Sequence, residues 1–220
     1  MVTSSPSYLC YFVVSVLLLS LPSHFADPDP LQDFCVADFT RASKSDNVFA
    51  CKAITEVTSD DFVFDGAREK GNITDLFGLN VTDGNVLAFP ALNTLGVSMN
   101  RVDFAPGALN PPHLHPRASE IGIVIEGTIL AGFVTTNNVY YSKVLTAGQM
   151  FVIPRGLVHF QLNIGQGNAL SITAFNSHLP GSSKLPLNMF SAMPSIPDQV
   201  LTKTFQVDQD VISSIRSKFG

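Results

Sequence analysis

The chain has 220 residues and a mass of 23.7 kDa, enough for one substantial domain with a buried core. Hydrophobic residues make up 45% of it and charged residues only 14%, which excludes an intrinsically disordered chain. The net charge of −5 comes from 13 basic and 18 acidic side chains, and the basic residues do not cluster. This charge argues against a nucleic-acid backbone as a partner.

An apolar stretch from Tyr8 to Leu21 lies close to the N-terminus. Its 14 residues are too few to span a bilayer comfortably. With small residues after it, the stretch predicts a secretory signal peptide over residues 1–26, cleaved after Ala26. The alternative is a retained N-terminal anchor, which is disfavoured because no basic stop-transfer sequence follows. The mature chain, from Asp27, is expected to be extracellular and free of the membrane.

The number of cysteines is consistent with a secreted protein. Cys10 leaves with the signal peptide, so Cys35 and Cys51 remain as a pair. In an oxidising compartment they are expected to form a disulfide, against the alternative of two buried free thiols. Closing a loop of this size stabilises the N-terminal arm, residues 27–60, by about 3 kcal/mol.

Two N-x-[ST] sequons lie in a polar, glycine-containing region. They begin at Asn72 and Asn80. Both are candidate sites of surface glycosylation, although sequons also occur by chance.

From Leu95 onward, short runs rich in Val, Ile, Phe and Tyr alternate with turn residues about every ten positions. This spacing is typical of an all-β sandwich or barrel. The barrel is expected to occupy about residues 90–180. Its predicted strands are 95–104, 120–126, 128–134, 139–145, 149–153, 158–163 and 169–176.

The segment after the barrel is rich in proline, at positions 180, 186, 194 and 197, so neither a helix nor a central strand is expected there. Beyond it, residues 198–204 and 208–218 each begin with an acidic residue suited to an N-cap. Two short helices are therefore predicted within residues 198–219, packed on their own barrel or on a neighbouring subunit. The second helix places on one face Val211, Ile212 and Ile215.

Two motifs, GALNPPHLHPRASE at 107–120 and GQMFVIPRGLVH at 148–159, contain three of the five histidines. In an extended chain the two histidines of H-x-H point to the same face, because side chains alternate with period two. Barrel closure can bring ligands from separate strands together. An isolated H-x-H favours ordinary surface histidines, but the combined motifs predict one metal site. Its four candidate ligands are His113, His115, Glu120 and His159.

Three neutral imidazoles and one carboxylate suit a borderline divalent metal. An octahedral ion would keep two positions open for water, dioxygen or a small anion. Ligand type alone does not separate manganese from iron, nickel or zinc.

Other polar residues near the motifs have ordinary interpretations. His178 lies outside both motifs and is expected to be a solvated turn residue, and Glu126 a charge at a strand end. Arg117 and Arg155 could orient an anion, but the expected role of each is a surface salt bridge or a solvated charge.

The two motifs resemble the paired metal motifs of the cupins. Longer segments, together covering essentially the whole mature chain, resemble plant germins and germin-like proteins. Residues 27–220 are thus expected to form a single germin-type cupin domain. The segments are DPDPLQDFCVADF at 27–39, NTLGVSMNRVDFAPG at 93–107, NPPHLHPRASEIG at 110–122, FVIPRGLVHFQLN at 151–163 and SIPDQVLTK at 195–203.

The resemblance implies a jelly-roll barrel that binds manganese. It also implies a hexamer, built as a trimer of dimers, in which the C-terminal helices clasp neighbouring subunits. The expected location is the plant cell wall or apoplast. The resemblance further implies oxidation of oxalate to carbon dioxide and hydrogen peroxide, or superoxide dismutation, and a role in defence. Asn100 and Asn110 match the two asparagines that oxalate-oxidising germins place beside the metal. The sequence departs from true germins at Ala108-Leu109 and between Lys52 and Pro90.

Two functions are compatible with the sequence. One is a manganese oxidoreductase acting on a small anion or oxygen species, and the other is a non-enzymatic metal-binding matrix glycoprotein. Fold and ligands alone do not separate them, but the presence of Asn100 and Asn110 favours the enzyme. An oligomer is also expected from the residues themselves, because a single barrel cannot bury the apolar side chains opposite His159, which are Val158, Phe160 and Leu162.

Overall fold

A computed structural model of the chain describes residues 32–41, 49–73 and 75–219. The predicted signal peptide, with its cleavage site and Cys10, lies outside these residues.

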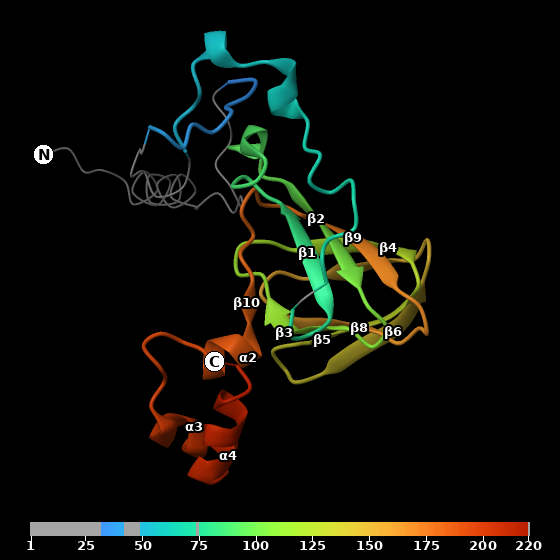
Figure 1. The fold of residues 1–220 in the computed structure, drawn as a ribbon, viewed down its shortest axis with the longest axis vertical. Coiled ribbons are helices and arrows are strands. Elements are labelled where there is room, and N and C mark those ends of the chain that lie inside the picture. The colour runs from blue at the N-terminus through green and yellow to red at the C-terminus, as the bar shows by residue number, and fades with distance from the viewer. Residues whose placement is uncertain (1–31, 42–48, 74, 220) are drawn as a thin grey trace, which may run out of the picture.

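Within the described residues, ten strands form two five-stranded antiparallel sheets that close into a barrel (Figure 1). The fold is therefore all-β, as predicted. The first sheet has the order β1 (Leu79–Gly84), β2 (Ser98–Phe104), β9 (Ala169–Phe175), β4 (Glu120–Glu126) and β7 (Met150–Ile153). The second has the order β10 (Ser183–Lys184), β3 (Leu109–Leu114), β8 (Val158–Asn163), β5 (Thr128–Val134) and β6 (Tyr140–Thr146).

All seven strands predicted from the sequence are present, most with bounds within one residue. The first begins three residues later than predicted because Thr94 and Gly96 adopt positive φ angles of 68° and 66°. These angles form a turn that a strand cannot contain. The neighbouring Leu95 and Val97 are consequently exposed rather than part of the sheet.

The strands β1, β3 and β10 and one helix, α2 (Leu185–Phe190), were not predicted from the sequence. The expectation that the proline-rich segment holds no helix is wrong. Pro186 lies in the first turn of α2, where a backbone N–H has no partner within the helix, so its absence costs nothing. The strand β10, just before α2, pairs with β3 at the edge of the second sheet.

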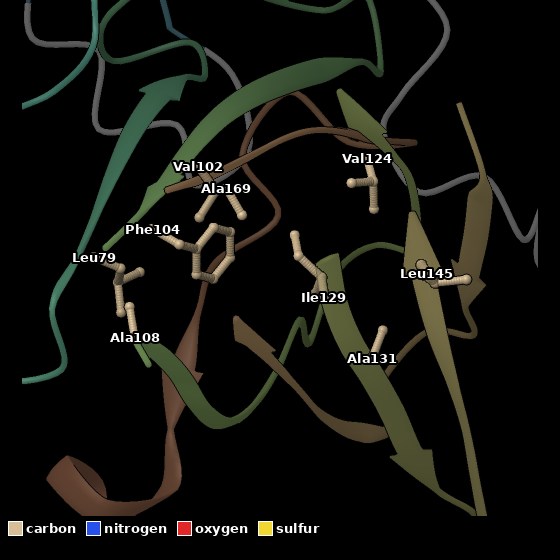
Figure 2. Close-up of a cluster of buried hydrophobic side chains, with 9 residues drawn as sticks. All are labelled: Leu79, Val102, Phe104, Ala108, Val124, Ile129, Ala131, Leu145 and Ala169. Carbon is tan, nitrogen blue, oxygen red and sulfur yellow. The ribbon is translucent and has the colours of Figure 1, made fainter. Parts of the chain in front are cut away.

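The hydrophobic core fills the space between the two sheets (Figure 2). Phe104, Val124 and Ile129 are completely buried there. The core therefore occupies one part of the barrel interior and leaves another part to polar side chains. Its buried members are Leu79, Val102, Phe104, Ala108, Val124, Ile129, Ala131, Leu145 and Ala169.

The N-terminal arm contains the predicted disulfide between Cys35 and Cys51. Two short 3-10 helices follow it, η1 (Ile54–Glu56) and η2 (Ser59–Phe62), and a third, η3 (Pro90–Leu92), precedes β2. A backbone hydrogen bond from Ala37 to the carbonyl of Pro90 joins the arm to the segment before β2. The disulfide closes a loop within the arm, and the bond to Pro90 holds the arm beside one end of the barrel (Figure 1).

Both predicted C-terminal helices are present, as α3 (Asp198–Phe205) and α4 (Gln209–Arg216), and they lie beyond α2, away from the sheets (Figure 1). Neither has the predicted side-chain N-cap: Asp198 instead forms an ion pair with Arg216 that joins the two helices. Ile212 is buried, whereas Val211 is 43% exposed. Among the helices described, none combines the length and the apolar character needed to cross a membrane.

Candidate metal centre

The four predicted ligands meet inside the barrel. One ligand atom from each lies within 4.8 Å of all the others, and every one of the four residues is at most 7% exposed. Ligand–metal bonds of about 2.1 Å place the ligands of one ion within roughly 4.2 Å of one another, so these atoms are already close to a binding arrangement. The residues come from both sheets and from the loop after β3: His113, His115, Glu120 and His159.

A β-bulge in β3 shapes this part of the barrel. Asn110 lies opposite Gln161 of β8, and three positions later His113 lies opposite His159, so two prolines of β3 face a single residue of β8. The extra residue resets the alternation of side chains, which allows Asn110 and His113 to share the inner face despite their odd spacing. Prolines suit such a bulge because they have no N–H to lose from the ladder.

The three imidazoles are held in one orientation by the backbone. Each Nδ1 lies within hydrogen-bond distance of a carbonyl oxygen, which can only accept, so the ring hydrogen is on Nδ1. In the neutral ring that a metal ligand requires, this leaves the Nε2 lone pair available to the ion. The Nδ1–O distances are 2.8 Å from His113 to Pro111, 2.6 Å from His115 to Gly181 and 2.9 Å from His159 to Leu157.

Glu120 carries the negative charge of the cluster. Burial by itself raises the pKa of its carboxyl group, but hydrogen bonds with His115 and His159 outweigh burial and lower the pKa to about 2. Burial, reinforced by the nearby His159, lowers the pKa of His113 to about 3. Glu120 is therefore a carboxylate and His113 a neutral ligand.

The distances within the cluster favour a cation at its centre. Oε2 of Glu120 lies 3.0 Å from Nε2 of His115 and 3.2 Å from Nε2 of His159. A carboxylate oxygen and an unprotonated imidazole nitrogen both present lone pairs, so they approach this closely only with a proton or a metal ion between them. One divalent ion can take the place of these protons and satisfy all four groups. The residues present therefore fit a metal.

The cluster opens onto a cavity of about 140 Å³. A cavity of this size can hold water molecules or a small ligand. Valines and Phe175 form its apolar wall, and the aromatic ring of Phe175 packs against His115. Its polar wall consists of Asp83, Asn100, Asn110, Gln161, Thr173, Ser182 and Lys184.

Both predicted asparagines line this cavity. Asn100 donates to Asp83 at 2.8 Å and accepts from the backbone N–H of Gly84. Asn110 donates to Oε1 of Gln161 at 2.7 Å, while its own Oδ1 is buried without any partner among the described residues. An unsatisfied buried acceptor costs about 1–3 kcal/mol, which a bound water or ligand can recover.

Gln161 is a cavity residue that was not predicted from the sequence. It accepts from Asn110 and donates to Oε1 of Glu120 at 3.3 Å, so it joins the asparagine to the metal-ligating carboxylate. The sequence does contain a signal for this role. Gln161 follows His159 by two residues, and residues two apart on a strand point to the same face.

His178 is not a solvated turn residue, and that expectation is wrong. It is 4% exposed, and its Nδ1 accepts a hydrogen bond from the backbone N–H of Thr94, in the positive-φ turn before β2. A buried ring here supports a turn that Thr94 by itself disfavours. His178 does not belong to the metal cluster.

The remaining predicted residues are exposed. Glu126 ends β4, as expected. Arg117 and Arg155 donate to backbone carbonyls, those of Leu179 and Pro116, so each fastens a loop rather than forming a salt bridge.

A barrel of two antiparallel sheets enclosing three histidines and a glutamate defines the class of this protein as a cupin. In agreement, the cupin family model matches residues 65–213.

Sequence similarity to known proteins extends over nearly the whole chain. Germin-like protein subfamily T member 2 of Arabidopsis thaliana is 53% identical over 98% of this chain and 97% of its own. Oxalate oxidase 2 of Hordeum vulgare is 48% identical over 96% of both chains. A solved structure of recombinant oxalate oxidase in complex with glycolate is 48% identical, with a TM-score of 0.86 over 88% of this chain and 98% of its own. The chain belongs to the family of germin-like proteins.

Proposed function

We propose that this protein is a secreted, manganese-dependent oxidase of oxalate. The observation that carries the proposal is the buried cluster of three histidines and one glutamate, which opens onto a small cavity whose wall includes Asn100 and Asn110. The similarity to oxalate oxidases supports it. In the reaction, oxalate loses two electrons and its carbon–carbon bond breaks to give two carbon dioxide molecules, while dioxygen takes up the electrons and two protons to give hydrogen peroxide.

The manganese ion would be held by the four clustered ligands and would supply Lewis acidity and redox chemistry. The protein's own side chains would position the substrate. Asn110 offers a free Oδ1 and a second N–H at the cavity wall, and its bond to Gln161 fixes the direction of both. Asn100 is held by Asp83 and Gly84 on the facing sheet. The apolar wall around Phe175 excludes water from part of the site.

Superoxide dismutation is the related activity that the same centre could perform, because it needs only an accessible redox-active ion and no organic substrate. Peroxide production from either reaction would suit a defensive role in the apoplast. Under this proposal, glycans would be attached at the exposed Asn72. At Asn80, Nδ2 donates to Thr82 within β1, so a glycan there would replace a hydrogen bond of the strand.

The proposal includes a homohexamer, and a row of apolar side chains supports an interface. Across the first sheet, Met99, Ala174, Ile121 and Val152 lie opposite one another in register. Met99, Ile121 and Val152 are 55%, 47% and 59% exposed in the single chain. An apolar row of this kind is typical of a surface that another subunit covers.

Light scattering on the natively secreted protein is therefore expected to give a hexamer at micromolar concentration. The substitution Ile121→Lys would put a charge in the middle of the apolar row and is expected to shift the protein to smaller species. Asn168→Lys, which adds the same charge in the exposed loop between β8 and β9, serves as the control. A monomeric wild-type protein would contradict the assembly.

A further inference from the structure

Lys184 lies at the metal cavity although neither sequence motif includes it. In the short strand β10 it pairs with the metal ligand His113 of β3. Directly opposite residues of antiparallel strands present their side chains on the same face of the sheet. Because the His113 side chain faces the barrel interior, the side chain of Lys184 is directed to the same side, and it lines the cavity together with Ser182.

The ammonium group of Lys184 is available to a ligand. It forms no hydrogen bond or ion pair with the part of the chain that the structure describes, although it contributes a favourable charge at Asp83 across the cavity. The carboxylate of Asp83 already accepts a hydrogen bond from Asn100. The cavity wall thus carries the ammonium group of Lys184, which has no hydrogen-bond partner among the described residues, and the carboxylate of Asp83, which is hydrogen-bonded to Asn100.

We propose that Lys184 is a specificity-determining residue that makes this site selective for small dianions, in particular compact dicarboxylates. One carboxylate of the ligand occupies the open side of the metal, and Lys184 pairs with the second. This inference rests on the proposed function only for the presence of the metal. Size agrees with it, since a cavity of about 140 Å³ admits a two-carbon dicarboxylate.

Calorimetric binding in the absence of dioxygen tests the proposal without any turnover. The probes are oxalate, which carries two charges near neutral pH, and glycolate, which has the same carbon skeleton and one charge. For the manganese-loaded protein, Lys184→Met is expected to weaken oxalate binding about tenfold and to leave glycolate binding nearly unchanged. Lys184→Arg, which keeps the charge, is expected to retain most of the oxalate affinity.

Two control variants separate a local effect from net charge. Lys203→Met, an equal charge change on the exposed surface of α3, is expected to leave both affinities unchanged. Asp83→Asn removes the negative charge but keeps an acceptor for Asn100, and is expected to strengthen oxalate binding. The loss of oxalate affinity in Lys184→Met is also expected to be smaller at high salt, because salt screens the attraction between the lysine and the second carboxylate.

Equal oxalate affinities of wild type and Lys184→Met would overturn the proposal and would show that the lysine only balances Asp83. An equal loss of oxalate and glycolate binding would overturn it as well, since the lysine would then shape the site rather than read the second charge. Failure of the proposed oxidase function is a separate result, because a protein that binds oxalate through Lys184 without producing peroxide would retain this inference and lose the other.

Discussion

Replacing His115 by alanine is expected to abolish stable manganese binding and, with it, both oxalate oxidation and superoxide dismutation. Loss of one imidazole removes a quarter of the protein ligands and leaves Oε2 of Glu120 without one of its two imidazole partners. Removing even an outer hydrogen-bond partner of a metal ligand costs roughly 10–100-fold in affinity, so removing a ligand is expected to cost at least about a hundredfold. Elemental analysis and a peroxide assay on the same sample measure both effects.

The matched control is His178→Ala, which removes another buried histidine, outside the cluster. It is expected to lower thermal stability through loss of the bond from Thr94, while manganese occupancy stays close to that of the wild type. If His115→Ala kept full occupancy and activity, the four-ligand assignment would be wrong.

Replacing Asn110 by alanine is expected to have a different signature. Manganese remains bound and superoxide dismutation largely survives, but oxalate turnover falls about tenfold to a hundredfold, the range typical of a lost positioning contact. The reason is that Asn110 is not a metal ligand. It lines the cavity, and its link to the metal ligands runs through Gln161, whose amide also donates to Glu120.

A useful control is Asn168→Ala, because Asn168 is exposed in the loop between β8 and β9. That variant is expected to match the wild type in metal content and in both activities. Loss of manganese from Asn110→Ala would assign the asparagine a structural role in the cluster and would contradict its proposed contact with the substrate.

The barrel strands were predictable because their local sequence pattern favours the same structure that their surroundings in the barrel require. In β4, β5 and β8, short apolar runs are bounded by turn residues, and the structure begins and ends these strands at the predicted positions. The edge strand β1 was missed because its sequence LNVTDG is mostly polar and contains a sequon. The pairing partner, not the local sequence, makes it a strand.

The metal ligands were predictable for the same reason: they are concentrated in two motifs on strands, where period two applies. Asn110 was identified only through the family resemblance, because its odd spacing from His113 sends it outward unless a bulge intervenes. Lys184 could not be found at all from the chain alone. It reaches the cavity through a two-residue strand in a proline-rich segment, and only its pairing with His113 shows the connection.

The proposed oxidase requires that the cluster of three histidines and one glutamate binds manganese and that the bound ion oxidises oxalate. Both requirements can be measured on one preparation of the protein from its native source, analysed for its metals and then assayed for hydrogen peroxide with oxalate as the substrate. We expect close to one manganese ion per chain and peroxide formation in proportion to the oxalate consumed. Full manganese occupancy with no peroxide from oxalate would contradict the proposed oxidase, and full occupancy with no superoxide dismutation either would favour a non-enzymatic matrix glycoprotein.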